Sequence, residues 1–325
     1  MALIVVDMGY FNLKMIDENE NITILQNAYV SSSENDNSLP LDDKTRKVTL
    51  QIVDPKFGIT NLTRTYGENA CHMVSHVQGV GSRKAEEVRF SFASMLSSKQ
   101  HNEKLNVFCI HNEEKDFSMI EKSILGHYKV QINGESISCN VISCTCLREG
   151  IGTYFQLKKT QNLAGTTRIL DLGFGVANDL IVNDLGKIEY YATKPELSIM
   201  MLAKNIENSE VFQNYMKDYN SNLGSIAYAL QKNRSMGSIP KNEWDHMKSY
   251  AISQYYKKLK TYLTAPMANA NLFVSTYVLT GGGATILNLE NKAFKTAFTI
   301  PDDAHIASLI GILNHPEIIK VKSKW

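Results

Sequence analysis

Two short stretches of the sequence place an aspartate and a glycine at the same spacing after an apolar run. The first is VVDMGYFNLK, with Asp7, Gly9 and, five residues later, Lys14. The second is RILDLGFG, with Asp171 and Gly173. Glycine lets backbone N–H groups approach an anion, lysine adds positive charge, and a carboxylate binds magnesium through its water shell. Each stretch is therefore a candidate turn for binding phosphate and magnesium.

The same two stretches also fit ordinary β-turns, because Asp and Gly are favoured turn residues. Their duplication favours the phosphate interpretation, since two such turns facing each other can hold one polyphosphate from both sides. A third element, the triplet Gly281–Gly283, follows the apolar run LFVSTYVLT. A flat glycine backbone is suited to packing against a purine and its ribose, but such a triplet also forms simple strand-to-helix turns.

The composition limits the possible function classes. The chain has 325 residues, of which 43% are hydrophobic, and its formal net charge is +1. It is long enough for a sizeable core and two domains, and it has no long run of Lys and Arg, so direct nucleic-acid binding is disfavoured. The start MALIVVDMG has no basic leader segment, and we find no stretch of 18 apolar residues, so we expect a cytoplasmic protein.

The cysteines and histidines do not form a recognisable catalytic pattern. Five cysteines, an odd number, lie mostly in apolar strand-like contexts that are typical of reduced core thiols. Cys144 and Cys146 could bind a metal ion, but the sequence has no second close Cys/His pair to complete the ligand set. A metal site is therefore not the favoured interpretation. The eight histidines are scattered, without the Ser or Cys partners of a hydrolase triad.

Periodicity predicts the elements that must position these turns. The first half alternates strand-like and helix-like patterns, including a hairpin of strands 127–132 and 136–144 around Asn133-Gly134. The second half starts over, with a helix at 150–159, strands at 167–173, 179–182 and 187–192, and then three helical stretches. The longest of these spans 243–263, and its Trp244, Met247, Tyr255 and Leu259 are expected to form one core face. A closing amphipathic helix is expected over 302–313.

With these elements in order, the chain resembles the actin, heat-shock chaperone and sugar-kinase superfamily, and within it the plasmid-segregation actins of the ParM/StbA type. VDMGYFNLK is similar to the first phosphate turn of that family, LDLGFG to the second, and LTGGGATIL to the adenosine element. YGENA, LREGIGTYF and DDAHIASLIGIL resemble three further segments of the family. The resemblance covers most of the chain.

This resemblance implies an α/β fold of the actin-like (ribonuclease H-like) type, with two domains and a nucleotide cleft between them. Domain I would comprise residues 1–150, completed by the C-terminal helix at about 302–325, and domain II residues 151–301. The implied cofactors are ATP or GTP with Mg2+.

The resemblance also assigns site residues. Glu149 and Asp171 are implied to be catalytic, with Glu149 orienting the water that attacks the γ-phosphate, and Asp7 and Asp171 are implied to bind the metal ion. The implied nucleotide-binding residues are Gly9, Tyr10, Phe11, Asn12, Lys14, Gly173, Phe174, Gly175, Gly281, Gly282 and Gly283. For Glu149, a purely structural role at a helix N-terminus remains an alternative.

The second turn departs from the family pattern D-x-G-G-x-T-x-D. The stretch DLGFGVAND places Asn178 seven positions after Asp171 and Asp179 eight positions after it. Either the turn carries one extra residue, or the second acid has become an amide. Both alternatives affect the expected hydrolysis rate more than nucleotide binding.

The function implied by the resemblance is a filament-forming ATPase that polymerises with bound nucleotide and segregates plasmid DNA through a DNA-binding adaptor. The near-neutral charge is consistent with a filament that does not touch DNA itself. A small-metabolite kinase of the same superfamily and a nucleotide-gated, non-catalytic scaffold are the alternatives.

Overall fold

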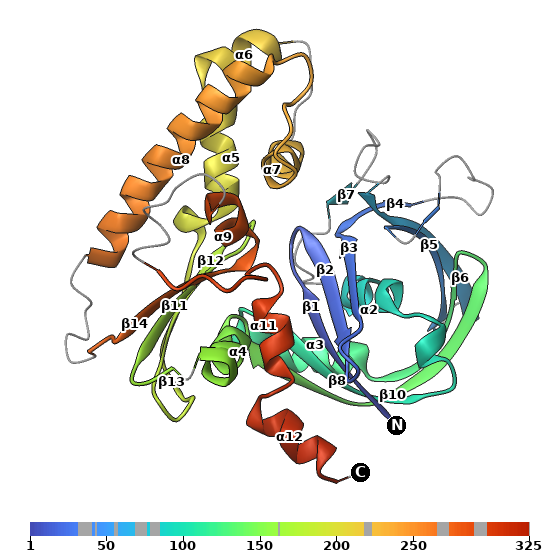
Figure 1. Ribbon diagram of the computed structural model, residues 1–325. Coiled ribbons are helices and arrows are strands. Elements are labelled where there is room, and N and C mark those ends of the chain that lie inside the picture. The colour runs from blue at the N-terminus through green and yellow to red at the C-terminus, as the bar shows by residue number, and fades with distance from the viewer. Residues whose placement is uncertain are drawn as a thin grey trace. The chain divides into compact units, whose positions relative to one another are not determined.

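The structure is a computed structural model that describes residues 1–31, 41–42, 44–54, 58–68, 77–78, 85–161, 163–217, 223–264, 273–288 and 298–324. The chain divides into two compact units, Met1–Arg148 and Glu149–Trp325. Each unit has its own sheet and its own covering helices (Figure 1). Among the described residues, no helix combines the length and the apolar character needed to cross a membrane.

The described residues of the first unit form a ten-stranded sheet in the order β3-β2-β1-β8-β10-β9-β5-β6-β4-β7. Its strands are β1 (Ala2–Met8), β2 (Asn12–Asp17), β3 (Ile22–Gln26), β4 (Ala28–Ser31), β5 (Thr45–Asp54), β6 (Gly58–Gly67), β7 (Val77–Gln78), β8 (Lys104–His111), β9 (Gly126–Ile132) and β10 (Glu135–Arg148). β1, β8 and β10 run parallel. β1 and β8 have the nearly continuous buried, apolar sequences that are typical of parallel strands.

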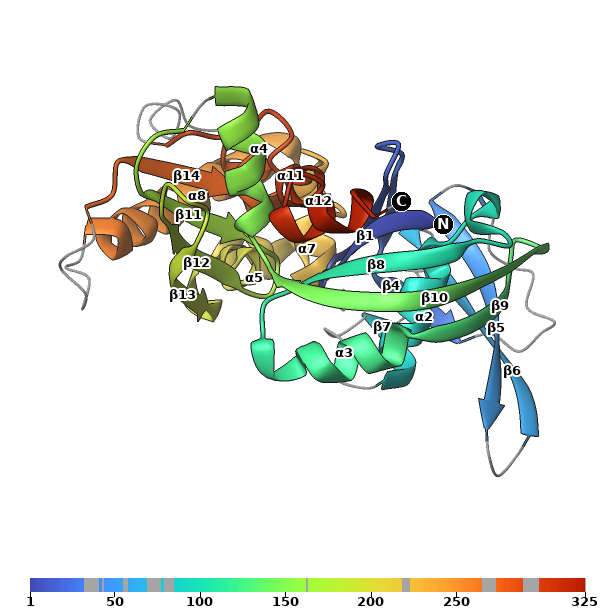
Figure 2. The same ribbon diagram turned by 90° about the horizontal axis from the view of Figure 1, so that it is seen from below.

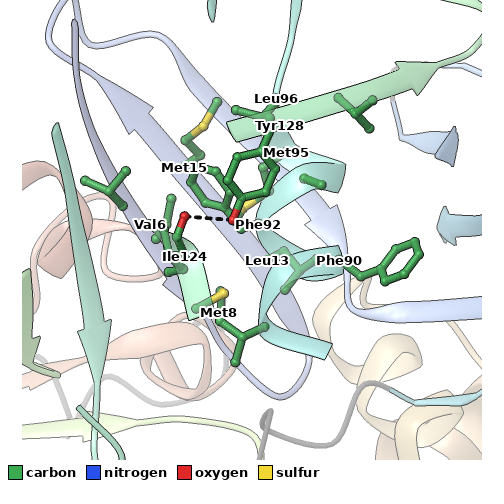
Figure 3. Packing of buried hydrophobic residues seen from close by; sticks show 14 of the residues in the cluster. Val6, Met8, Leu13, Met15, Phe90, Phe92, Met95, Leu96, Ile124 and Tyr128 are labelled. Carbon is green, nitrogen blue, oxygen red and sulfur yellow. Dashed lines mark hydrogen bonds between the residues drawn. The ribbon is translucent and has the colours of Figure 1, made fainter. Parts of the chain in front are cut away.

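Helices α2 (Ala85–Met95) and α3 (Phe117–Ile124) pack on this sheet (Figure 2). Two short 3-10 turns, η1 (Ser98–Gln100) and η2 (Glu114–Asp116), flank β8. Val88, Phe92 and Met95 of α2, and Leu96 directly after it, are completely buried. Figure 3 shows Phe92 and Met95 packed with side chains of β1 and β2, and the Tyr128 hydroxyl donating a hydrogen bond to the Ile124 carbonyl (2.9 Å).

The predicted hairpin around Asn133-Gly134 is confirmed. β9 and β10 pair antiparallel from Ile132 and Glu135 onward. Asn133 and Gly134 both have positive φ angles, +51° and +89°. This is the conformation that a tight two-residue hairpin needs, and Asn-Gly is its preferred sequence.

The described part of the second unit contains a four-stranded sheet in the order β13-β12-β11-β14. Its strands are β11 (Thr167–Leu172), β12 (Ala177–Val182), β13 (Ile188–Lys194) and β14 (Thr276–Thr280). The helices are α4 (Ile151–Gln161), α5 (Ile199–Glu207), α6 (Glu210–Tyr215), α7 (Leu223–Gln231), α8 (Lys241–Thr264), α9 (Gly281–Asn288), α11 (Ala307–Ile312) and α12 (Pro316–Lys322), with a 3-10 turn η3 (Pro195–Leu197). The predicted core face of α8 is confirmed, because Trp244, Met247, Tyr255 and Leu259 are all buried.

Two glycines set the closest helix contact of this unit. A Cβ on Gly152 of α4 would lie 1.8 Å from the Ser308 carbonyl oxygen, and a Cβ on Gly311 of α11 would lie 1.8 Å from the Gly152 carbonyl oxygen. Neither position can therefore accept a side chain, and the backbones of α4 and α11 lie directly against each other. The association of residues 302–325 with the first domain, which the family resemblance implies, remains a prediction.

Candidate functional site

The first candidate turn joins β1 to β2. Antiparallel pairing places Asp7 opposite Lys14. Lys14 Nζ donates to Asp7 Oδ2 over 2.8 Å, and only 8% of Asp7 is exposed. A largely buried ion pair with short geometry holds both side chains in place at the base of the turn. The acid and the base that the sequence singled out are thus in direct contact.

Asn27, which follows β3, anchors this turn from behind. Its Nδ2 donates to the Gly9 carbonyl and its backbone N–H to the Phe11 carbonyl, each over 2.8 Å. In a trans peptide the C=O and N–H groups point in opposite directions, so the N–H of Tyr10 points away from Asn27. A Cβ on Gly9 would approach the Asn12 carbonyl oxygen to 3.0 Å, so the bend is tight.

The second candidate turn joins β11 to β12 and is anchored in the same way. The carbonyls of Gly173 and Phe174 accept hydrogen bonds from the backbone N–H groups of Ile199 (3.1 Å) and Met200 (2.8 Å) at the start of α5. The N–H groups of Phe174 and Gly175 consequently point away from α5. A Cβ on Gly173 would lie 2.6 Å from the Val176 carbonyl oxygen, so this bend also requires glycine.

Both turns therefore follow a buried aspartate and have their carbonyls bound from behind. Outward-pointing N–H groups in such a bend form the concave donor set that binds anions. The sequence indicated the Asp-x-Gly spacing, but not the groups that anchor the carbonyls. Asn27 does not belong to any recognisable sequence motif. Ile199 and Met200 donate through their backbone N–H groups, so their residue types do not indicate this role.

The glycine triplet begins α9 beside Asp171, and its three members differ. Gly281 has φ +84°, and a Cβ there would lie 2.3 Å from Asp171 Oδ1. A Cβ on Gly283 would lie 2.6 Å from the Ile199 side chain, whereas nothing lies within 4 Å of one on Gly282. Gly281 and Gly283 are thus required by packing, and Gly282 has open space next to its backbone.

The residue that follows Glu149, Gly150, lies close to Asp171. Gly150 has φ +87°, and a Cβ there would lie 3.6 Å from the Asp171 Cβ and 2.7 Å from the Leu180 side chain. Only a glycine in the left-handed region fits this bend. Glu149 therefore directly precedes a tight contact with the strand that carries Asp171.

The structure distinguishes Asn178 from Asp179. Asp179 is completely buried and accepts hydrogen bonds from Arg168 Nε (3.0 Å) and Nη2 (2.8 Å) and from the Tyr262 hydroxyl (2.6 Å). Burial and the bond to Asp179 raise the pKa of Tyr262, so this hydroxyl stays a donor. Asp179 is thus committed to a structural ion pair, on the opposite face of the sheet from Asp171.

Asn178 is the residue on the face of Asp171, because the two are directly opposite in the β11–β12 ladder. Its Oδ1 accepts a hydrogen bond from the Tyr191 hydroxyl over 3.0 Å. Of the two alternatives that the sequence left open, the structure therefore supports the replacement of the second acid by an amide.

No group of three or more His, Cys, Asp and Glu side chains that would hold a metal ion occurs among the described residues. This finding is compatible with magnesium bound to a nucleotide, since such an ion keeps several waters and takes only one or two protein carboxylates besides the phosphates. Asp7 and Asp171 are the two carboxylates that the sequence predicts for this role.

No protein-family model matches the sequence, and no curated protein matches it either. Solved structures match over the whole chain. A ParM from a 15-stranded filament of Clostridium botulinum has a TM-score of 0.73 at 13% identity, with 100% of this chain and 99% of that chain covered. This chain has the actin-like two-domain fold.

Two further structures support that conclusion. An archaeal actin homologue has a TM-score of 0.72 at 16% identity, with 98% of this chain and 99% of that one covered. A Bacillus thuringiensis ParM determined with ATP has a TM-score of 0.70 at 13% identity, with 99% of both chains covered. The actin-like fold expected from the sequence is therefore confirmed.

Proposed function

We propose that this protein is an actin-like ATPase that polymerises with bound nucleotide. The observation that carries the proposal is the repeated turn: Asp7 and Asp171 each end a strand, and each is followed by a glycine bend whose carbonyls are bound from behind. Two anion-binding turns of the same kind in one chain suit a polyphosphate ligand, because each turn can bind phosphate oxygens. The ParM with ATP shows that a protein of this fold takes this ligand.

In this proposal the backbone N–H groups of Tyr10, Phe174 and Gly175 donate to phosphate oxygens, and Lys14 adds positive charge. Asp7 and Asp171 hold magnesium, which neutralises charge on the phosphates. Gly282, with open space beside it, receives the nucleoside. The nucleotide is ATP or GTP, and the remaining predicted residues, Gly9, Phe11, Asn12, Gly173, Gly281 and Gly283, shape the turns.

Hydrolysis is assigned to Glu149. Phosphoryl transfer to water needs positioning and charge stabilisation rather than covalent catalysis, so one carboxylate that orients the attacking water has a large effect. The bend at Gly150, which brings the chain against Asp171, supports this assignment.

Assembly into filaments is supported by the fold shared with the ParM of the Clostridium botulinum filament. We propose that the polymer segregates plasmid DNA through a separate DNA-binding adaptor in the cytoplasm. The low net charge of +1 agrees with a filament that does not itself bind DNA.

A nucleotide-gated scaffold that does not hydrolyse is the second candidate, and Asn178 favours it. An amide opposite Asp171 cannot accept a proton from water as a carboxylate can. The ATPase and the scaffold both bind nucleotide, so a measurement of phosphate release distinguishes them: only the ATPase releases phosphate.

The proposal is tested by comparing two buried acids at opposite ends of the β1–β2 hairpin. Asp7→Asn removes the charge of the candidate site, whereas Asp17→Asn changes an acid that accepts hydrogen bonds from the turn at Asn19 and Asn21. We expect Asp7→Asn to weaken the binding of magnesium–ATP, measured by calorimetry, by about tenfold or more, the equivalent of losing one charged contact. Asp17→Asn should bind as the wild type does. Equal affinities of the wild type and a folded Asp7→Asn variant would refute the proposal.

A further inference from the structure

The connection between β10 and α4 consists of two residues, Glu149 and Gly150. Its second residue is fixed by packing, since Gly150 has φ +87° and a Cβ there would lie 2.7 Å from the Leu180 side chain. The Gly150 carbonyl also accepts the backbone N–H of Thr153 over 3.1 Å, in the first turn of α4. Glu149, the proposed water-orienting residue, is therefore held on its C-terminal side by the bend at Gly150.

The residue on the N-terminal side of Glu149 is Arg148, which ends β10. In the register of the two parallel strands it lies beside His111, the last residue of β8. The strands run side by side (Figure 2), and their register ends at this pair. Any attachment of the chain beyond this pair must therefore come from side chains.

The side chain of Arg148 supplies such an attachment, because it binds the connection between β8 and α3. Its Nη1 atom donates to the Asn112 carbonyl over 2.8 Å, and its Nη2 atom donates to a carboxylate oxygen of Glu114. The guanidinium carbon lies 5.6 Å from the centroid of the Phe117 ring, a cation–π contact at the start of α3. One arginine thus contacts three groups of the same connection.

This connection is itself ordered by contacts within it. The backbone N–H of Asp116 donates to the Glu113 carbonyl over 3.1 Å, and Nε2 of His111 lies 3.5 Å from Oδ2 of Asp116. The rings of His111 and Phe117 lie 6.4 Å apart, measured between their centroids. Arg148 is therefore attached to a segment with a defined conformation.

The two hydrogen bonds of Arg148 differ in their expected strength. The side chain of Glu114 is 72% exposed and that of Arg148 is 25% exposed, so water screens their ion pair. The bond to the Asn112 carbonyl needs no second charge, and its charged donor makes it stronger than a bond between neutral groups. Most of the attachment is therefore expected from the carbonyl, and little from Glu114.

We propose that Arg148 is a positioning residue for hydrolysis and that it acts through Glu149. This inference rests on the proposed function, because it requires Glu149 to orient the attacking water. A misplacement of about 1 Å at such a group is enough to slow a reaction strongly. Arg148 fixes the chain before Glu149, and the bend at Gly150 fixes the chain after it. No contact between Arg148 and the nucleotide is needed.

Arg89 of α2 supplies a matched control at the other end of α3. Its Nη1 atom donates to the carbonyls of Ser123 (3.3 Å) and Leu125 (3.2 Å). Its guanidinium carbon lies 4.4 Å from the centroid of the Tyr128 ring. Arg89 therefore makes the same kinds of contact as Arg148, to backbone carbonyls and to an aromatic ring. Arg89→Met should lower the stability of the protein without changing the rate of hydrolysis.

The test measures three properties of the full chain: phosphate release at saturating magnesium–ATP, affinity for magnesium–ATP by calorimetry, and pelleting. Arg148→Met keeps an unbranched side chain and removes every donor. We expect phosphate release to be about fivefold slower, as for the loss of a charged hydrogen bond that is partly exposed to water. Affinity and pelleting should equal those of the wild type. Glu114→Gln should release phosphate within about twofold of the wild-type rate.

A double variant shows whether Arg148 acts through Glu149. Adding Arg148→Met to Glu149→Ala should cause no further loss of rate, since the group that Arg148 positions is already absent. If Arg148→Met does not fold, Arg148→Lys takes its place in the test. Lysine keeps the charge but cannot form both bonds at once, so this variant should release phosphate about twofold more slowly at unchanged affinity.

The wild-type rate of phosphate release in folded Arg148→Met, or in Arg148→Lys where it takes its place, would overturn the inference. An equal loss of rate in Arg89→Met, weaker nucleotide binding in Arg148→Met, or a further loss in the double variant would also overturn it. Failure of the proposed function gives a different result. The wild type then binds no nucleotide or releases no phosphate, or Glu149→Ala releases phosphate at the wild-type rate.

Discussion

At the scale of single residues, Asn27 is the clearest example of a residue whose role in the site was not predicted from the sequence. Its side chain and backbone both donate to carbonyls of the first turn. Asn27→Ala removes the bond to the Gly9 carbonyl, which costs about 1 kcal/mol and frees the bend to move. We predict about fivefold weaker binding of magnesium–ATP, measured by calorimetry, since this ratio corresponds to about 1 kcal/mol.

Asn21→Ala is the matched control for this prediction. Asn21 also donates through its side chain within this sheet, to Asp17 (2.7 Å), but at the opposite end of β2. This variant should lose stability without losing nucleotide affinity. If both variants weaken binding equally, Asn27 acts through the stability of the hairpin and not through the turn.

Asp179 shows what residue spacing leaves undecided. The next acid, Asp179, lies eight positions after Asp171 instead of the seven of the family pattern. This spacing is compatible with an extra residue in the turn or with an amide, Asn178, in place of the acid. The choice depends on which residue of β12 faces which side, and a shift of one residue reverses the faces. The ladder fixes Asp171 opposite Asn178, and Arg168 then binds Asp179 on the other face. The candidate site could be predicted as a set of residues, but not this division of roles.

At the scale of elements, the start of α9 allows a test of the glycine triplet. Gly282→Val adds a side chain into open space, so we expect a folded protein with weakened nucleotide binding. Gly283→Val places its Cβ 2.6 Å from Ile199, so we expect lower stability. Thermal unfolding and calorimetry on both variants check the contrast. A folded Gly282→Val variant with normal affinity would limit the triplet to a structural role.

Helix α12 makes stability dependent on pH through its N-cap, His315. The Nδ1 atom of His315 accepts the N–H of Glu317 (3.2 Å), and the ring packs edge-on against Phe155. Burial lowers the pKa of His315 from 6.5, with Lys320 acting in the same direction and Glu317 opposing it. The unfolded chain therefore binds this proton more tightly, and the free energy of unfolding falls as the pH drops below about 6.5.

His315→Asn keeps a good N-cap without a titrating group. Between about pH 7.5 and about pH 5.5, thermal unfolding of this variant should therefore change less than that of the wild type. His246→Asn, a change at an exposed position of α8, should retain the wild-type pH dependence. An unaltered pH dependence in His315→Asn would contradict the account of this cap.

Elements with strong local signals could be predicted from the sequence. The Asn133-Gly134 hairpin follows from turn chemistry, and the buried face of α8 follows from its periodicity over many turns. The short helix α6 (Glu210–Tyr215) was not predicted, and the C-terminal helix expected at about 302–325 is divided into the two short helices α11 and α12. Helices of so few residues draw their stability from tertiary packing and capping, which leave little periodic pattern.

At the scale of the whole molecule, the fold and the function rest on different grounds. The order of three short motifs indicated an actin-like fold, and matches over the full chain at TM-scores up to 0.73 confirm it. The sequence identities to these structures are only 12–16%, so the structural similarity does not establish the activity of this chain. The proposals of assembly and hydrolysis therefore rest on the repeated turns and on Glu149, and both activities have to be measured on this protein.

The most direct measurement follows pelleting and phosphate release on the same samples, with and without ATP or GTP and magnesium. The account predicts that the wild type pellets only with magnesium and a nucleoside triphosphate, and then releases phosphate. Glu149→Ala should pellet in the same way but release phosphate about 10²-fold more slowly, because a group that orients the attacking water acts in the transition state. Pelleting that is independent of nucleotide, or no pelleting and no phosphate release with either nucleotide, would contradict it.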